Sequence, residues 1–157
     1  MRFYLVRHGE AVPSVVDPAR PLTERGRDDV ERVATFSRSV GVEVSQICHS
    51  GKRRAEETAA IFAEHLAPAG GLALVPALRP DDDVRPVAEV LNQAAEPLML
   101  VGHYPHLVRL AGLLLADDKR RPVVDFRMGA IACLERDPRA KTWSLCWMVP
   151  PDIVHAF

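Results

Sequence analysis

The sequence Leu5-Val6-Arg7-His8-Gly9-Glu10 joins a short apolar run to a group of polar residues. The apolar run predicts a buried strand over residues 2–7. In an open α/β sheet, ligands bind in the crevice beyond the carboxyl ends of the strands. Arg7 and His8 lie at such an end, where burying them costs free energy unless an anion or a reaction uses them. The stretch therefore predicts that His8 is a nucleophile and that Arg7 binds a phosphate; the alternative is a surface strand end with incidental polar residues.

The composition predicts one soluble globular domain over residues 1–157, with 48% hydrophobic and 26% charged residues. The 20 Lys and Arg residues nearly balance the 21 Asp and Glu residues, so charge does not indicate a nucleic-acid or membrane partner. The three cysteines form no Cys-x-x-Cys pair, which argues against a disulfide framework or a zinc ribbon. Because the chain starts with a strand rather than a signal peptide, we expect a cytoplasmic protein.

Strands and helices alternate along the chain. Strands are predicted at 2–7, 44–48, 72–75, 97–101, 129–135 and 143–149, and helices at 23–40, 51–66, 84–94 and 105–116. This order predicts an α/β fold, a three-layer α/β/α sandwich around a mostly parallel sheet with an antiparallel edge. Trp143 and Trp147 alternate with Leu145, so we expect both on the same face of the sheet. The tail from Pro150 is expected to be extended.

Three of the predicted strands end on polar residues that suit a single anion. Arg7 and His8 follow the first strand, Ser50 follows the second, and Gly102-His103 follow the fourth. Because the carboxyl ends of parallel strands share one edge of the sheet, residues far apart in the sequence can meet there. Gly9 lets the backbone turn sharply after the first strand and approach a ligand closely.

The helix that follows Ser50 supplies a further cation. Its first-turn amides and the positive end of its dipole favour an anion at the same edge of the sheet. Arg54 lies about one turn into this helix, and Thr58 lies one turn further along the same face. Lys52 and Arg53 are expected to belong to a solvated face that pairs with the glutamates next to them.

These motifs resemble those of the histidine phosphatase superfamily, which includes phosphoglycerate mutases and acid phosphatases. The matching segments are Arg7-His8-Gly9, Ser50-x-x-x-Arg54-Ala55-x-x-Thr58 and Gly102-His103-x-Pro105. The short chain, the sequence Arg20-Pro21-Leu22-Thr23-x-x-Gly26 and the lack of the long insertions of the mutases make it most similar to the SixA-type phosphohistidine phosphatases. The resemblance covers nearly the whole chain.

The resemblance implies a phosphatase that needs no metal and no cofactor. His8 would attack phosphorus and become phosphorylated, and water would then release phosphate. Arg7, Arg54 and His103 would hold the phosphoryl oxygens, where negative charge spreads. A backbone carbonyl would fix the tautomer of His8, and His103 would be protonated when the phosphate is bound. The residues expected to contact the substrate are Gly9, Thr23, Ser50 and Gly102, although Thr23 is first expected to cap its helix.

The general acid for the leaving group has no motif of its own. The broader family places a Glu or Asp there, and the candidates are Glu10, Asp81 and Asp82, with Asp17 and Asp83 as further carboxylates. A phosphohistidine can leave as neutral imidazole if its other ring nitrogen carries the proton, whereas an alkoxide is a poor leaving group. A site without a nearby carboxylate would therefore favour N–P substrates over O–P substrates.

These residues are compatible with four candidate functions, which they favour to different degrees. The first is a phosphatase for a phosphohistidine-bearing protein, and the second is a phosphomonoesterase for a small phosphorylated substrate. The third is a non-catalytic phosphate-binding module, against which the joint presence of His8, Arg7, Arg54 and His103 argues. The fourth, a metallohydrolase that uses His8, His49 and His103, is disfavoured because Arg7 would repel a dication.

Overall fold

The computed structural model describes residues 1–154, which form one six-stranded sheet in the order β3-β2-β4-β1-β5-β6. The strands are β1 (Arg2–Arg7), β2 (Gln46–His49), β3 (Leu72–Leu74), β4 (Leu98–Gly102), β5 (Ile131–Asp137) and β6 (Thr142–Val149). The first four strands in the chain pair in parallel, whereas β5 pairs antiparallel with β1 and β6. The predicted mostly parallel sheet with an antiparallel edge is confirmed.

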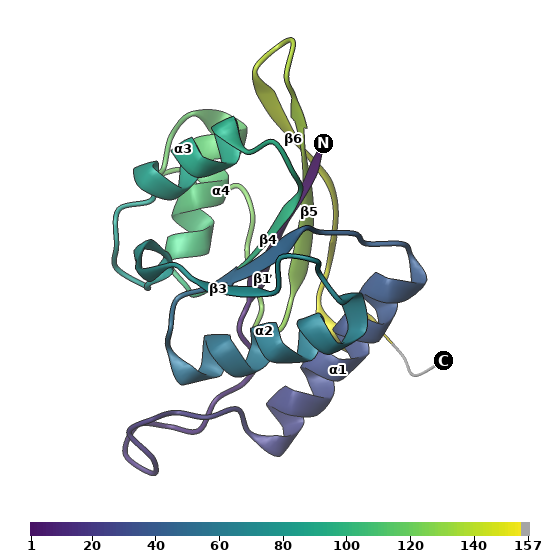
Figure 1. The fold of residues 1–157 in the computed structure, drawn as a ribbon. Coiled ribbons are helices and arrows are strands. Elements are labelled where there is room, and N and C mark those ends of the chain that lie inside the picture. Colours follow the sequence, from purple (N-terminus) through teal and green to yellow (C-terminus); the bar gives the residue numbers. More distant parts are fainter. Residues whose placement is uncertain (155–157) are drawn as a thin grey trace.

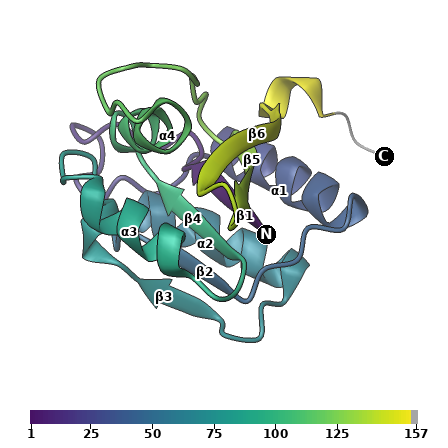
Figure 2. The same ribbon diagram turned by 90° about the horizontal axis from the view of Figure 1, so that it is seen from above.

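Within residues 1–154, four α-helices cover the two faces of the sheet (Figure 1, Figure 2). α1 (Glu24–Ser39) and α2 (Arg53–Leu66) pack on one face, and α3 (Arg85–Gln93) and α4 (His106–Ala116) pack on the other. Successive side chains of β1 alternate between these faces. Tyr4 and Val6 enter the core under α1 and α2, and Phe3 and Leu5 enter the core under α3 and α4. The apolar run of β1 therefore contributes to both cores.

The helix ends lie close to the predicted positions. α2 begins at Arg53, slightly later than expected, because Gly51 adopts φ +89° and forms a turn before the helix. Two short 3₁₀ helices, at Pro76–Leu78 and Pro151–Ile153, were not among the predicted elements. The second contradicts the expectation of an extended tail from Pro150, because a proline suits the first position of a helical turn.

The two tryptophans of β6 lie on opposite faces of the sheet, so the expectation that they share a face is wrong. A β-bulge in the pairing of β5 with β6 leaves Cys146 as an extra residue between them. One extra residue reverses the alternation of side chains along a strand. Trp143 packs against Phe3, with ring centroids 5.3 Å apart, and Trp147 packs against Tyr4 in the other core, with centroids 6.1 Å apart.

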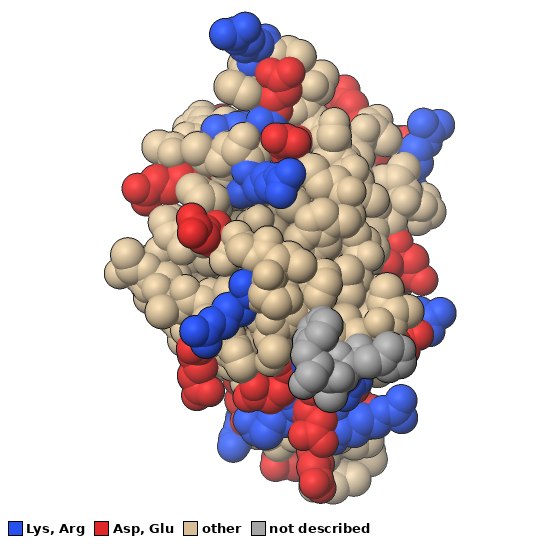
Figure 3. Space-filling model, turned by 90° about the vertical axis from the view of Figure 1, so that its right-hand side faces the viewer, with Lys and Arg blue, Asp and Glu red and all other residues tan. Residues whose placement is uncertain are grey.

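The surface shown in Figure 3 carries interspersed charges rather than a patch of one sign, as Lys and Arg side chains lie among Asp and Glu side chains. This distribution agrees with the formal net charge of −1. None of the helices within residues 1–154 is both long enough and apolar enough to cross a membrane.

Candidate active site

Three strand ends meet at the carboxyl edge of the parallel strands and bring His8, Ser50 and His103 together, in a site here termed the histidine hollow. The imidazole centroids of His8 and His103 lie 5.0 Å apart, and the Ser50 hydroxyl lies 2.6 Å from His103 Nε2. Strand pairing sets this arrangement: Arg7 is in register with Gly102, and the His8 N–H donates to the Gly102 carbonyl at 3.1 Å. All three polar residues are buried.

Backbone contacts fix the ring of His8. Its Nδ1 lies 2.7 Å from the Gly9 carbonyl oxygen. Because a carbonyl only accepts hydrogen bonds, Nδ1 carries the hydrogen and Nε2 carries the lone pair. The Gly9 N–H donates to Thr58 Oγ1 at 3.1 Å, and the Thr58 hydroxyl donates to the Arg54 carbonyl at 2.8 Å. The two motif residues of α2 thus anchor the turn that carries His8.

Close packing explains the glycines at positions 9 and 26. A Cβ added to Gly9 would lie 2.8 Å from Val30 Cγ2 and 2.9 Å from the Gly26 carbonyl oxygen. A Cβ added to Gly26 would lie only 2.1 Å from the Glu10 carbonyl oxygen. The first turn of α1 can therefore press against the backbone just after His8 only because both positions lack a side chain. This contact is the physical basis of the glycine in the Pro-Leu-Thr-x-x-Gly pattern.

Burial and neighbouring cations keep both histidines neutral at pH 7. The pKa of His8 is lowered from 6.5 to about 4, chiefly by burial and then by the charges of Arg54, Arg7 and Arg20, although the hydrogen bond to Gly9 raises it. The pKa of His103 is lowered to about 3, again chiefly by burial. A proton on His103 therefore requires an anion beside it.

Several buried polar atoms around the hollow have no hydrogen-bond partner within residues 1–154. They are Arg7 Nε, Arg54 Nε and His103 Nδ1. Arg7 is oriented by the bond from its Nη1 to the Phe126 carbonyl at 2.7 Å, and its guanidinium lies 5.5 Å from the Tyr104 ring centroid. An unpaired buried polar group costs about 1–3 kcal/mol. An anion in the hollow would remove this cost.

Arg20 also lies near the hollow, although no motif position assigned it a role. It belongs to the loop between β1 and α1, where it adopts φ +48° and donates from Nε to the Val12 carbonyl at 3.1 Å. Its charge contributes to lowering the pKa of both His8 and Arg54. The residue stands in the Arg-Pro-Leu-Thr stretch, but the direction of a loop side chain depends on contacts that this stretch does not contain.

The predicted substrate-contact residues already have partners in the protein. The Thr23 hydroxyl oxygen accepts from the Gly26 N–H at 2.9 Å, which makes Thr23 the cap of α1 as expected. Ser50 Oγ accepts from the Lys52 N–H at 3.2 Å in addition to its contact with His103. Substrate contacts by Gly9, Thr23, Ser50 and Gly102 stay predictions.

Glu10, one candidate for the general acid, points toward the surface. Its side chain forms a 3.8 Å ion pair with Arg25 and, together with Arg7, lines a cavity of about 560 Å³. Within residues 1–154, neither His8 nor His103 forms a hydrogen bond with a carboxylate. Residues 1–154 therefore bring the two histidines and the arginines together with no carboxylate hydrogen-bonded to either histidine, while the charge of Asp125 acts on Arg7 and raises its pKa.

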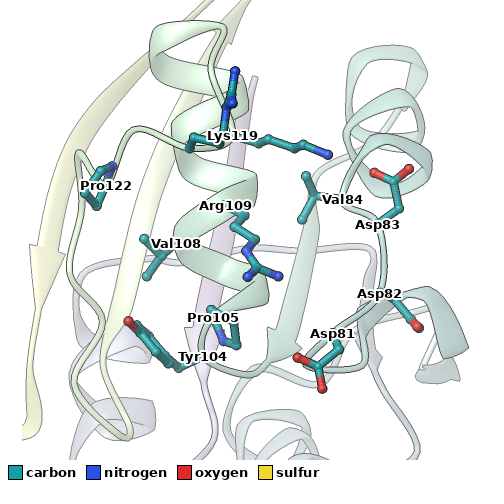
Figure 4. A pocket seen from close by; sticks show the side chains of 11 residues that line it. Asp81, Asp82, Asp83, Val84, Tyr104, Pro105, Val108, Arg109, Lys119 and Pro122 are labelled. Atoms are coloured by element: carbon teal, nitrogen blue, oxygen red, sulfur yellow. The ribbon is translucent and has the colours of Figure 1, made fainter.

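Asp81 and Asp82, the other candidates, line a separate groove of about 680 Å³ that begins at Tyr104 (Figure 4). Asp82 is engaged in a 3.0 Å ion pair with Arg79. Within residues 1–154 neither carboxylate forms a hydrogen bond or an ion pair with the histidine hollow, so the assignment of a general acid stays a prediction.

Two further histidines, His49 and His106, lie near the site. His49 Nδ1 accepts from the Gly51 N–H at 3.1 Å and so supports the turn before α2. His106 is fully buried on the first turn of α4, burial lowers its pKa, and neither ring nitrogen has a hydrogen-bond partner within residues 1–154. In the part of the chain that the structure describes, no group of three or more His, Cys, Asp or Glu side chains is placed to hold a metal ion.

Sequence and fold both relate the chain to known proteins. Residues 3–79 match the family described as the histidine phosphatase superfamily (branch 1). The chain is 29% identical to phosphohistidine phosphatase SixA of Escherichia coli (strain K12) over an alignment of 122 residues. This alignment spans 74% of this chain and 73% of that protein. A structure of the protein histidine phosphatase SixA complexed with tungstate is similar with a TM-score of 0.85 and 25% identity, over 97% of this chain and 98% of that chain. The chain therefore matches the histidine phosphatase superfamily over residues 3–79 and is similar to SixA over most of its length.

The fold likeness of this chain extends to an enzyme that is named for a small substrate. A mycobacterial glucosyl-3-phosphoglycerate phosphatase is similar with a TM-score of 0.71 and 19% identity, over 93% of this chain and 97% of that chain. At this identity the likeness concerns the fold alone. The same fold thus accommodates more than one substrate class, and the substrate of this chain has to be argued from its own residues.

Proposed function

We propose that this chain is a histidine phosphatase and that it hydrolyses phosphohistidine in proteins through a phosphorylated His8. One observation carries the proposal: His8 is buried, neutral and fixed with its lone pair on Nε2, beside polar atoms of Arg7, Arg54 and His103 that lack protein partners. The similarity to SixA, which is named a phosphohistidine phosphatase, supports the substrate class.

In the first step, His8 Nε2 attacks phosphorus while the N–P bond of the substrate breaks. The electron pair of that bond passes to the leaving ring nitrogen, and the hydrogen on the other ring nitrogen makes the leaving group a neutral imidazole. Arg7 and Arg54 stay charged and hold the phosphoryl oxygens, over which negative charge spreads in the transition state.

In the second step, water attacks the phosphorus of phosphorylated His8. The bond between phosphorus and Nε2 breaks, its electron pair returns to Nε2, and both hydrogens of the water leave with the phosphate. The Gly9 carbonyl keeps the hydrogen on Nδ1 in both steps, because the two atoms lie 2.7 Å apart. The ring therefore returns to its starting tautomer without a separate proton shuttle.

His103 supplies a contact that depends on the anion. Its ring is neutral in the surroundings that the protein provides, since its pKa is about 3. A phosphoryl dianion beside the ring favours the protonated form and raises this pKa. The two histidines then divide the work: His8 acts as the nucleophile, and His103 binds the phosphoryl oxygens as a cation.

A small-molecule phosphomonoesterase is the second candidate, and the position of Asp81 is the observation that favours it. Asp81 lines the groove that begins at Tyr104, the residue that follows His103 in the sequence. An alkoxide leaving group needs an acid that protonates it, and Asp81 could serve as that acid. Hydrolysis of a phosphohistidine peptide and of an alkyl phosphate should be compared at equal concentration. Faster turnover of the alkyl phosphate would favour this second function over the first.

The phosphoenzyme itself provides the direct test. Incubation with phosphoramidate should label the wild-type protein with an acid-labile phosphoryl group, and the His8→Asn variant should acquire none. His65→Gln is the matched control. His65 lies in the last turn of α2, where it pairs with Glu31 of α1 at 2.6 Å, and it is not part of the hollow. Equal labelling of His8→Asn and the wild type would overturn the proposed nucleophile.

A further inference from the structure

A charged groove beside the histidine hollow has no assigned role in phosphohistidine hydrolysis. Its volume of about 680 Å³ lies within the range of ligand sites. One wall is the segment before α3, and the other is α4 with the loop that follows it (Figure 4). The charged residues on these walls are Asp81, Asp82, Asp83, Arg109, Lys119 and Arg120.

The groove begins where the hollow ends. Tyr104 and Pro105 line the groove, and they directly follow His103 of the hollow. The ring of Tyr104 also lies 5.5 Å from the Arg7 guanidinium, so one side chain borders both spaces. A substrate with its phosphoryl group at His8 can therefore extend over Tyr104 into the groove.

The acidic wall is largely neutralised by ion pairs. Asp82 pairs with Arg79 at 3.0 Å, and Asp83 pairs with Arg85 at 2.7 Å. Asp83 accepts from both Nε and Nη2 of Arg85, which is a bidentate contact. Of the three aspartates, only Asp81 has no ion pair within residues 1–154.

The basic wall is not neutralised. Arg109, Lys119 and Arg120 form no ion pair with any residue that the structure describes. Figure 4 shows Arg109 on the groove side of α4 and Lys119 reaching across toward Val84. Three lining cations without an ion pair therefore stand against one lining carboxylate without one, and the charge of Lys119 also contributes to lowering the pKa of Asp83. When Arg79 and Arg85, the partners of Asp82 and Asp83, are counted with the lining residues, the groove has an excess of positive charge.

We infer that the groove binds an acidic stretch of polypeptide next to the phosphorylated residue of the substrate protein. The inference rests on the proposed function, because the phosphoryl group at His8 places the flanking chain over Tyr104. Val84, Val108 and Pro122 lie among the charges, so the groove can contact both apolar and anionic side chains of an extended segment. Complementary charge of this kind raises the association rate and selects the partner.

Two phosphohistidine peptides test the inference. They should be identical except that three Asp or Glu residues beside the phosphohistidine are replaced by Asn or Gln in the second. At low ionic strength, wild-type protein should hydrolyse the acidic peptide with about fivefold higher kcat/KM, the size expected for a few exposed ion pairs. In the double variant Arg109→Gln/Lys119→Gln the two peptides should become equivalent, while turnover of phosphoimidazole stays at the wild-type level.

Arg139→Gln/Lys141→Gln is the matched control, because it removes two cations from the turn between β5 and β6. This variant should keep the preference for the acidic peptide. Wild-type protein without a preference, or equal losses in both double variants, would overturn the inference. Failure to hydrolyse phosphoimidazole as well as the peptides would instead contradict the proposed function.

Binding provides a readout that does not need turnover. The His8→Asn variant should bind the acidic phosphopeptide about fivefold more tightly than the neutral one in a fluorescence-anisotropy titration. Adding Arg109→Gln and Lys119→Gln to this variant should remove the difference. Equal affinity of His8→Asn for the two peptides would overturn the inference whatever the enzymatic activity proves to be.

Discussion

The histidine hollow and the groove beside it are both rich in charge, but they hold that charge in different ways. In the hollow, His8 and His103 are buried, and polar atoms of Arg7, Arg54 and His103 lack protein partners. In the groove, Arg109 and Lys119 are exposed to water, and two of the three aspartates are already paired.

This difference in burial agrees with the two proposed roles, phosphoryl transfer for the hollow and substrate recognition for the groove. Buried groups are expensive to leave unpaired, so they bind an anion strongly and their pKa values shift far from the ordinary range. Exposed charges are cheap to maintain and interact weakly, so each contributes only a small preference. Substitutions in the hollow should therefore have large effects on every substrate, and substitutions in the groove should have small effects on some substrates.

The largest effect is expected for His8, the proposed nucleophile. His8→Asn should lower the turnover of phosphoimidazole by at least about 10⁴-fold, because an amide cannot form the N–P intermediate. Lys119→Gln should leave the same turnover within about twofold, since an exposed charge is worth little to a substrate that does not reach it. Steady-state kinetics would check both variants. Activity of His8→Asn within tenfold of the wild type would remove the distinction between the two regions.

Arg54→Met should lower turnover by about 10²- to 10³-fold, as expected for the loss of one transition-state contact. The same change should raise the free energy of unfolding by about 1 kcal/mol, because the buried Nε has no partner. Arg53→Met is the control: Arg53 is mostly exposed and pairs with Glu57 at 3.8 Å, so activity and stability should both change little. Urea denaturation and kinetics would measure the two quantities, and a stability loss in Arg54→Met would contradict the argument.

In the absence of a bound anion, low pH should decrease the free energy of unfolding through His8. The pKa of His8 falls from 6.5 to about 4 on folding, so below pH 6.5 the unfolded chain binds the proton more readily than the folded one. The contribution of His8 to stability is complete above pH 6.5 and is lost as pH falls toward 4, by about 3 kcal/mol in total. Urea denaturation at pH 7 and pH 4.5, in a buffer without phosphate, should show a smaller decrease for His8→Asn than for the wild type. Equal decreases would mean that folding does not perturb this ring.

Ionic strength should give the smallest effect and should act mainly on the groove. Raising the salt concentration should reduce the several-fold preference for an acidic phosphopeptide, because exposed charges are screened. The turnover of phosphoimidazole should change less, since the cations of the hollow are partly buried. A kinetic titration with NaCl would measure both ratios, and an equal salt dependence for the two substrates would contradict the assignment of the groove.

Much of the fold followed from local patterns. The apolar run of β1, the cap at Thr23 and the strand-glycine-histidine pattern at Gly102 were sufficient to place the elements, because each depends on residues near it in the sequence. The bulge at Cys146 was not predictable in this way, since it depends on how β6 pairs with β5. Its consequence was the wrong expectation for the faces of Trp143 and Trp147.

The candidate site also has residues that local sequence predicts and residues whose positions depend on tertiary contacts. His8, Arg7, Arg54 and His103 were predicted from motifs that lie on or beside regular elements, and the structure places them close together. Arg20 was not assigned a role, because it lies in a loop, where it adopts φ +48° and the direction of its side chain does not follow from the local sequence. The candidate carboxylates for the general acid could not be ranked, because the positions of Asp81 and Asp82 depend on the packing of the segment before α3.

Residue identity and spacing alone determined that this chain alternates strands with helices and carries two imidazoles and two guanidiniums at the strand ends. Tertiary structure decided which of them are buried together, which nitrogen of His8 keeps its lone pair, and which charges beside the hollow stay free. The reason is physical: local patterns are set by neighbours in the sequence, whereas burial, proton affinity and ion pairing are set by neighbours in space.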